Sequence, residues 1–411
     1  MILFIIIFII KKIGLVGRKA PFLINLLFLF RNYKLLLLYG FLLCSSNTIA
    51  QNLYNSFSSP YLIISPDPVG SGKGETGVAT QPDYASLYWN PSKIVFNVDN
   101  AGFFTSYTPW LTDIHSGIYR LYFQGFNKIN PDNSLAYGID FFNIGGLSQY
   151  DEYGTPLGTL SPNDYSFQIS YSRRFGLDGA LGITAKYIHS DLALIAADGT
   201  ATFIPSHTLG FDLGWYLQKE LINGHKISFG ISALNIGPKL KVSQANFSQF
   251  LPMNLRWGFQ YDLIHSENVL NLSIDFNKYL LPTLPIYKLD TNGHPTSTIL
   301  KGQDPNKTIP SAIFGSFSDA PYGLSQELKE IQIGIGLDYC IQNALSVRTG
   351  YHYQNKELGG LSFATLGFGY KDNRFGFDLS YNYPIGSQNL YKDTFRISLN
   401  YRVESKPKPS H

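Results

Sequence analysis

From about residue 100 to the C-terminus, apolar and polar residues alternate along the chain. Near the end, for example, single polar residues separate Phe395, Ile397, Leu399, Tyr401 and Val403. Successive side chains of a strand point to opposite faces, so each run predicts a strand with one apolar face. The runs span about ten residues, enough for a tilted strand to cross a bilayer, and about fourteen are present, an even number as in single-chain outer-membrane barrels. They start near Asn100, Gly117, Ser134, Tyr165, Ala180, Ser206, His225, Met253, Asn268, Glu330, Leu345, Ser362, Arg374 and Thr394.

The connections between these runs alternate in length. If the barrel begins in the periplasm, the connections expected on that side are short, and those expected outside the cell are mostly long. The short ones comprise residues 176–179, 264–267, 341–344 and 372–373, and the long ones 144–164, 191–205, 236–252 and 278–329. Short periplasmic turns and long external loops are typical of outer-membrane barrels.

The polar face of the runs carries many charges. They include Asp140, Lys186, Asp212, Arg256, Asp275, Asp338, Arg348, Asp378 and Arg396. A soluble β-sandwich or lipocalin-like barrel would have to bury such charges at high cost, whereas a polar lumen accommodates them as cross-strand charge ladders. Tyrosines at the ends of apolar faces, such as Tyr339, Tyr381, Tyr383 and Tyr401, fit interfacial girdles. We therefore predict an all-β fold, a transmembrane antiparallel β-barrel over residues 100–403.

Residues 51–99 do not alternate and are rich in Pro, Gly and Ser. Three arrangements are open for a segment of this size: an internal plug, a periplasmic tail or a bound strand. The length and the Gly-rich turns favour an N-terminal plug, because the interior of a large barrel needs filling. Trp89, Asn90 and Pro91 form its most distinctive motif, and residues 404–411 are expected to be a periplasmic C-terminal tail.

Residues 1–50 have the pattern of a targeting segment. A short basic stretch at Arg31 precedes the apolar run 35–43, and small residues follow up to Ala50. This order predicts a secretory signal peptide with cleavage after Ala50, and the apolar run is shorter than the roughly 20 residues of a membrane-spanning helix.

Two further features of this segment bear on processing. A lipoprotein site at Cys44 is disfavoured, because the bulky Leu43 precedes it. Residues 1–30 contain a second apolar stretch that a signal peptide does not need, and we hypothesise that the gene model is over-extended there. N-terminal sequencing of the precursor tests this, and a start at Met1 would contradict it.

Removal of the segment changes the charge of the chain. The full sequence has a formal net charge of +3. The segment contains Lys11, Lys12, Arg18, Lys19, Arg31 and Lys34 but no Asp or Glu, so the mature chain stands at −3. A nucleic-acid role, which requires a basic face, is therefore not expected. Cleavage also leaves Cys340 as the single cysteine and predicts no intramolecular disulfide.

No pattern in the sequence predicts catalysis. Residues 70–75 resemble a phosphate loop, but Gly74 stands where Ser or Thr must follow the lysine, and no strand-to-helix context surrounds it. We interpret this stretch as a tight turn of the plug. The 8 His residues show no metal-binding spacing, and no Ser/His/Asp arrangement can be defended. We expect no enzyme activity, metal or cofactor.

Apolar residues in the expected outer loops are candidates for contact with a partner. They include Trp110, Leu111, Phe247, Phe250 and Leu251. Two interpretations are open for such residues: exposed contacts with a protein or lipid, or a loop folded over the barrel mouth.

Several motifs together carry a resemblance to a known family. Residues 66–93 read Pro-Asp-Pro-Val-Gly-Ser-Gly-Lys-Gly-Glu-Thr-Gly-Val-Ala-Thr-Gln-Pro-Asp-Tyr-Ala-Ser-Leu-Tyr-Trp-Asn-Pro-Ser-Lys. Further motifs are Ser-Tyr-Thr-Pro-Trp-Leu at 106–111, Ser-Tyr-Ser-Arg-Arg at 170–174, Ala-Leu-Asn-Ile-Gly at 233–237 and Asp-Phe-Asn-Lys at 275–278. The combination resembles the PorV (LptO) family of type IX secretion system outer-membrane proteins, within the FadL-like barrel superfamily.

The resemblance implies a plugged FadL-like barrel in the outer membrane of a Gram-negative bacterium. It also implies a role: binding the C-terminal domain of secreted cargo, receiving it at the giant translocon barrel and passing it to a sortase-containing attachment complex. Outer-membrane lipid is a further expected partner. The alternatives are a FadL-type channel for uptake of hydrophobic small molecules and a purely structural barrel.

Overall fold

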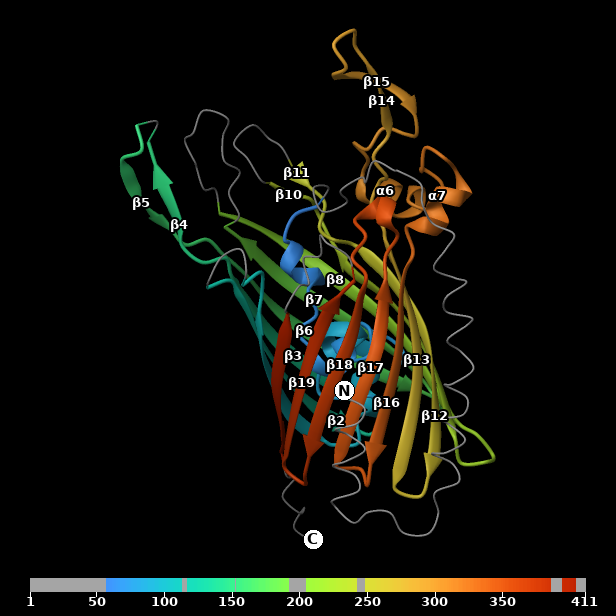
Figure 1. Cartoon of the computed structure of the whole chain (residues 1–411). Coiled ribbons are helices and arrows are strands. Elements are labelled where there is room, and N and C mark those ends of the chain that lie inside the picture. Colours follow the sequence, from blue (N-terminus) through green and yellow to red (C-terminus); the bar gives the residue numbers. More distant parts are fainter. Residues whose placement is uncertain are drawn as a thin grey trace. The chain divides into compact units, whose positions relative to one another are not determined.

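The computed structural model describes residues 57–112, 117–151, 153–191, 205–241, 248–385 and 394–403. In these ranges, fourteen antiparallel strands close into a barrel in the order β1-β2-β3-β6-β7-β8-β9-β12-β13-β16-β17-β18-β19-β20 (Figure 1). The strands are β1 Ala101–Pro109, β2 Tyr119–Asn130, β3 Asn133–Asn143, β6 Asn163–Phe175, β7 Gly179–Ser190, β8 Ser206–Glu220, β9 Lys226–Ile236, β12 Asn254–His265, β13 Asn268–Tyr279, β16 Gln332–Ile341, β17 Leu345–Tyr353, β18 Phe363–Lys371, β19 Phe375–Pro384 and β20 Phe395–Arg402. Pairing of β1 with β20 closes the barrel. The predicted fold class is confirmed, and each strand begins close to the start that the alternation indicates.

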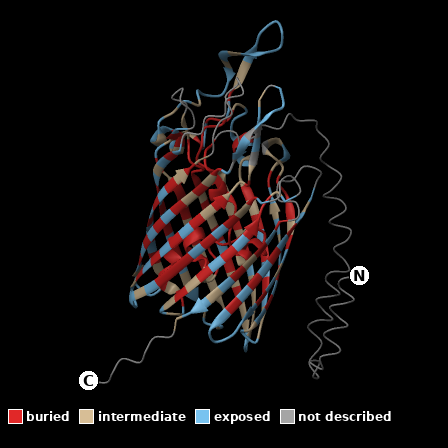
Figure 2. Cartoon of the chain, turned by 90° about the vertical axis from the view of Figure 1, so that its left-hand side faces the viewer, coloured by how far each residue is buried: buried red, intermediate tan, exposed pale blue. Residues whose placement is uncertain are grey.

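The alternation places apolar side chains on the outside and polar ones in the lumen. In β7, Leu181 and Ile183 are exposed on the outer face, whereas Thr184 and Lys186 are buried inside. Figure 2 shows the same change between exposed and buried positions along the other strands. A closed barrel pairs the backbone groups of its wall, so apolar side chains can face lipid without unpaired strand edges.

The charges predicted for the lumen are buried there, and several of them form ion pairs between strands of the wall. Lys186 Nζ lies 2.8 Å from Asp212 Oδ2. Arg348 bridges two carboxylates, at 3.3 Å from Asp338 and 2.8 Å from Asp378. These pairs confirm the charge-ladder interpretation, because each basic group faces an acidic one on an adjoining or nearby strand.

The two ends of the barrel differ in their connections, as predicted. The end with the long loops, here called the outer end, carries the additional elements of the chain (Figure 1). They are the paired strands β4 Leu147–Tyr150 and β5 Pro156–Leu160, β10 Leu240–Lys241 and β11 Ser248–Gln249, β14 Ile286–Leu289 and β15 Pro295–Lys301, and the helices α6 Ile309–Gly315, α7 Leu324–Lys329 and η4 Lys356–Leu358. Short turns at the opposite end correspond to the periplasmic side of an outer-membrane barrel.

Residues 57–99 lie inside the barrel as a plug. The plug contains the short helices η2 Pro60–Ile63, α4 Pro68–Ser71, α5 Ser86–Trp89 and η3 Pro91–Phe96. Asp275 of β13 accepts hydrogen bonds from the backbone N–H groups of Gly77 and Val78 at 2.6 and 2.8 Å. On the other side of the lumen, Arg396 of β20 donates to the carbonyl of Ser65 at 2.7 Å. The wall therefore holds the plug through polar groups that the alternation directs inward.

The predicted signal peptide, its cleavage after Ala50, the suspected over-extension at 1–30 and the tail 404–411 lie outside the described residues. Within the described part of the chain, no helix combines the length and the apolar character needed to cross a membrane.

Candidate partner-binding surface and plug

The Trp89 side chain is fixed by an acidic residue at the start of the plug. Asp67 caps α4 by accepting from the N–H groups of Val69 and Gly70 at 2.9 and 2.8 Å. Its Oδ2 also accepts from Trp89 Nε1 at 2.8 Å. Burial, reinforced by the charge of Asp83, raises the pKa of Asp67 to about 6, although these three donors oppose the shift. An Asp followed by Pro is a helix-start signal, so this cap could be found from sequence.

The amide of Asn90 joins the plug to two strands of the wall. Its Nδ2 donates to the carbonyl oxygens of Val78, Trp215 and Ile231 at 3.1, 3.0 and 3.4 Å. Its Oδ1 accepts hydrogen bonds from the backbone N–H and the hydroxyl of Ser92. Asn90 thereby caps the start of η3. The Trp-Asn-Pro motif is therefore the point where the plug is anchored to β8 and β9.

Glycines in the wall allow the plug to come this close. A Cβ added to Gly182 would lie 2.5 Å from the backbone nitrogen of Ser92, and one on Gly214 would lie 2.2 Å from Asn90 Oδ1. The former phosphate-loop candidate packs in the same way: a Cβ on Gly350 would meet the backbone of Lys73 and Gly74 at 2.3 Å. Gly74 has φ +70°, so this stretch is a tight turn against β17, as interpreted from the sequence.

An apolar cluster closes the outer mouth of the barrel, and we call it the mouth cluster. Its buried members are Phe57, Tyr61, Leu62, Ile63, Ile64, Trp110, Ile118, Phe142, Ile188, Phe250, Leu251, Met253, Tyr279, Leu280, Leu281, Ala312, Leu361 and Phe363. The start of the plug supplies one side and the outer loops supply the other. Phe57 forms a parallel bridge with Phe250, and its ring lies 5.6 Å from that of Tyr279.

The mouth cluster decides between the two interpretations of the apolar loop residues. Trp110, Phe250 and Leu251 are buried in it, and the partly buried Leu111 packs against it. Their burial fits the second interpretation, a loop folded over the barrel mouth, because residues far apart in the sequence cover these side chains. A role of these residues in partner contact stays a prediction. Phe247 lies outside the described residues.

The longest outer loop, residues 280–331, is fixed to β13 by buried charges. Lys278 Nζ lies 2.9 Å from Glu327 and 2.6 Å from Glu330, and all three side chains are almost completely shielded from solvent. Burial raises the pKa of Glu330, and Lys278 opposes that shift. Glu330 also accepts from the hydroxyl of Thr283 at 2.7 Å. Sequence reasoning missed this set, because the partners lie about fifty residues apart in a loop without periodicity.

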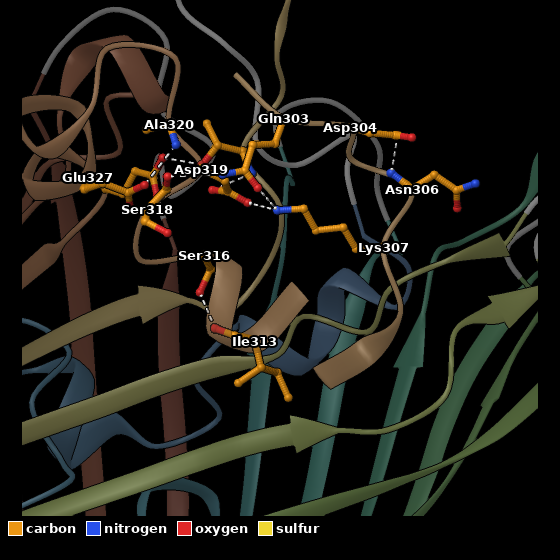
Figure 3. Close-up of polar contacts among 12 residues, drawn as sticks. Gln303, Asp304, Asn306, Lys307, Ile313, Ser316, Ser318, Asp319, Ala320 and Glu327 are labelled. Atoms are coloured by element: carbon orange, nitrogen blue, oxygen red, sulfur yellow. Dashed lines mark hydrogen bonds and ion pairs between the residues drawn. The ribbon is translucent and has the colours of Figure 1, made fainter. Parts of the chain in front are cut away.

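A second polar set folds the loop upon itself (Figure 3). Lys307 Nζ lies 3.0 Å from the buried carboxylate of Asp319 and 2.9 Å from Gln303 Oε1. Glu327 accepts from the backbone N–H of Ala320 at 2.9 Å. These contacts give the loop an ordered shape, which a surface for specific partners requires.

Two hairpins above the rim expose apolar side chains. Tyr150 and Tyr153 are exposed on the β4–β5 hairpin, Tyr153 at 84%, and Leu289 and Leu300 are exposed on the β14–β15 hairpin, Leu300 at 64%. Figure 1 shows both hairpins extending away from the barrel at its outer end. Exposed apolar groups beyond the membrane are candidates for contact with another protein.

Two cavities lie in the lumen. One of about 40 Å³ beside Trp89 is lined by Arg256, Asp275, His352 and other groups. A second, of about 530 Å³, lies at the periplasmic end among charged residues such as Lys73 and Arg348. Among the described residues, no group of three or more His, Cys, Asp and Glu side chains could hold a metal ion.

Comparisons with solved structures found outer-membrane channels. The P. putida toluene transporter TodX is similar, with a TM-score of 0.48, 12% identity and coverage of 82% of this chain and 98% of TodX. For the Ralstonia pickettii toluene transporter TbuX the values are 0.46, 11%, 82% and 98%. A Pseudomonas aeruginosa FadL homologue gives 0.44, 11%, 84% and 99%. No curated protein matches the sequence.

A family comparison is more specific. The model described as "Type IX secretion system protein PorV" matches residues 47–286, which include the plug and the barrel strands from β1 to β13. This match covers more than half of the chain. The protein therefore belongs to the PorV family and is an outer-membrane component of the type IX secretion system.

Proposed function

We propose that this protein holds the C-terminal domain of secreted cargo on its outer loops, receives it from the giant translocon barrel and passes it to the sortase-containing attachment complex. The observation that carries the proposal is the pair of ordered hairpins with exposed apolar side chains above a plugged barrel. Membership of the PorV family supports the same role.

The plugged lumen argues for binding at the surface rather than passage through the barrel. Asn90, Asp275 and Arg396 fix the plug to different strands of the wall, and the mouth cluster covers it from outside. A folded cargo domain could not cross a barrel of this size even without the plug, because only much wider barrels leave large channels.

The buried ion pairs of the long loop keep it in one conformation before a partner binds. Lys278, Glu327 and Glu330 hold the base of the loop, and Lys307 with Asp319 holds its interior. A partner that meets an already ordered surface loses less conformational entropy on binding. Trp110 and Phe250 also help to order this surface, because their burial in the mouth cluster fixes the loops around the rim of the barrel.

The rival function, uptake of hydrophobic small molecules, would need an apolar pocket inside the barrel. Typical ligand pockets measure about 300–1,000 Å³ and are mostly apolar. The cavity beside Trp89 measures about 40 Å³ and contains Arg256, Asp275 and His352. The larger cavity at the periplasmic end, about 530 Å³, falls within this size range, but charged groups such as Lys73, Asp338 and Arg348 lie in its lining. Neither cavity favours this alternative.

A binding assay with matched variants tests the proposal. The mature protein is placed in nanodiscs and titrated with the isolated C-terminal domain of a type IX secreted protein from the same organism. Tyr150→Ser with Tyr153→Ser, and separately Leu289→Ser with Leu300→Ser, remove the exposed groups of each hairpin. Ile222→Ser, on an exposed turn at the periplasmic end, is the control.

We expect at least one hairpin variant to weaken binding about tenfold or more, a loss of about 1.4 kcal/mol or more in binding free energy. The control should bind like the wild type. If both hairpin variants bind as tightly as the wild type, the hairpins are not the cargo surface.

A further inference from the structure

Helix α7 has its polar and apolar sides reversed relative to a water-exposed helix. Leu324 and Leu328 are four residues apart, so they lie on the same face, and they are 72% and 60% exposed. Gln326 and Glu327 are the buried residues of this helix. A helix on the surface of a soluble protein turns its apolar stripe inward and its charges outward.

The reversal is fixed by specific contacts. Glu327 is bound by Lys278 and by the N–H of Ala320, and Gln326 Oε1 accepts from the N–H of Tyr322 at 3.1 Å. Rotation of the helix to bury its leucines would leave the ammonium of Lys278 without Glu327 in the interior, at a high desolvation cost. The apolar face therefore stays exposed in the isolated chain and requires an apolar surrounding.

The position of α7 identifies that surrounding. Leu328 precedes Ile333, at the start of β16, by five residues, which spans at most about 18 Å of extended chain. Lys329 pairs with Glu357 of η4 at 2.7 Å, which holds α7 beside the loop that follows β17. Figure 1 shows α7 at the outer ends of the strands on this side of the barrel.

The wall below this site faces lipid. Ile335 of β16 and its register partner Tyr351 of β17 lie on the outer face of the wall and are exposed. The apolar face of α7 thus continues the lipid-facing surface of these strands upwards. In addition, Tyr322 is exposed, and Lys301 Nζ lies 5.1 Å from the centre of its ring. Tyrosine and lysine beside apolar residues are typical of the interface between lipid acyl chains and headgroups.

We propose that α7 lies in the outer leaflet of the outer membrane, with Leu324 and Leu328 among lipid acyl chains and Tyr322 at the headgroup level. The helix acts as an interfacial anchor that holds the base of the long loop at the membrane surface. The β14–β15 hairpin of the same loop remains in water. This inference does not depend on the proposed binding of cargo.

Spin labels in proteoliposomes test the proposal in the absence of any partner protein. Single labels are placed through Leu324→Cys and Leu328→Cys in a mature Cys340→Ser background, and their collision rates with oxygen and with a water-soluble nickel chelate are measured. Ile335→Cys provides the lipid-facing control, and Leu289→Cys, near the tip of the β14–β15 hairpin, provides the water-facing one. Heat-modifiable migration on gels verifies that each labelled barrel is folded.

We expect labels at Leu324 and Leu328 to resemble the Ile335 label, with oxygen collisions several-fold favoured over nickel collisions relative to the Leu289 label. Two results would overturn the proposal. One is nickel access at both positions equal to that at Leu289. The other is shielding that appears only when a translocon-containing membrane extract is added, because α7 would then be a protein contact.

Discussion

The indole N–H of Trp89 donates to Oδ2 of Asp67 across 2.8 Å and joins two parts of the plug that lie 22 residues apart. The same carboxylate caps α4. One buried acid thus orders both the first helix of the plug and the motif that anchors the plug to the wall. This arrangement makes the stability of the plug sensitive to pH.

The pH dependence has a definite direction. The pKa of Asp67 is raised by burial from its ordinary value near 3.8 to about 6, so the folded plug binds this proton more tightly than the unfolded chain. Its contribution to stability is therefore fully present below about pH 4, falls as the pH rises through about 6, and is constant above that. Thermal unfolding measured across this range should show the decline, and Asp67→Asn should remove it. An unchanged pH profile in the variant would assign the effect to another group.

Asn90→Asp should damage the plug more than Asn90→Ala. The alanine variant loses the hydrogen bonds to Val78, Trp215 and Ile231, at a cost of about 1–3 kcal/mol in all. The aspartate variant adds a negative charge that faces the same carbonyl oxygens. Single-channel conductance in planar bilayers should rise in the order wild type, alanine, aspartate. Equal conductance in all three would show that Asn90 does not hold the plug.

Two glycines of β7 provide a matched pair. A Cβ on Gly182 would lie 2.5 Å from the backbone of Ser92, whereas one on Gly179 meets its nearest atom at 3.5 Å. Gly182→Ala should displace the plug and destabilise the protein by about 1–3 kcal/mol, the usual cost of overpacking. Gly179→Ala should stay within about 0.5 kcal/mol of the wild type. Equal unfolding midpoints for the two variants would contradict the close packing of plug and wall.

Two lysines distinguish buried from exposed ion pairs in the long loop. Lys278→Met leaves Glu327 and Glu330 buried without their cation and should cost about 3–5 kcal/mol of local stability. Lys329→Met breaks the partly exposed pair with Glu357 and should cost about 0–1 kcal/mol. Limited proteolysis should cut residues 280–331 faster in the first variant only. Similar cleavage rates in both would mean that Lys278 does not anchor the loop.

The barrel could be predicted from the sequence because its wall has a simple period. Alternation over fourteen runs predicted the strands and the lumenal charges such as Arg348, and the parity of the connections predicted the two ends. Each of these signals is local. A strand that faces lipid on one side and a polar lumen on the other must show them in its own residues.

The outer surface could not be predicted in the same way. The sequence left open whether Trp110 and Phe250 are exposed or folded over the barrel mouth. In the structure, residues 57–64 of the plug reach the outer mouth and pack with them in the mouth cluster. The reversed helix α7 is likewise defined by Lys278, a residue of another element. Such contacts depend on where distant segments meet, and a single sequence holds no periodic signal for that.

The most direct test of the cargo-shuttle account is an affinity purification of the tagged mature protein from native outer membranes in mild detergent, followed by mass spectrometry of the proteins that accompany it. The account predicts secreted proteins that share a C-terminal domain, together with a very large barrel protein. A barrel that carries only a small hydrophobic ligand and none of these proteins would contradict it and favour the uptake channel.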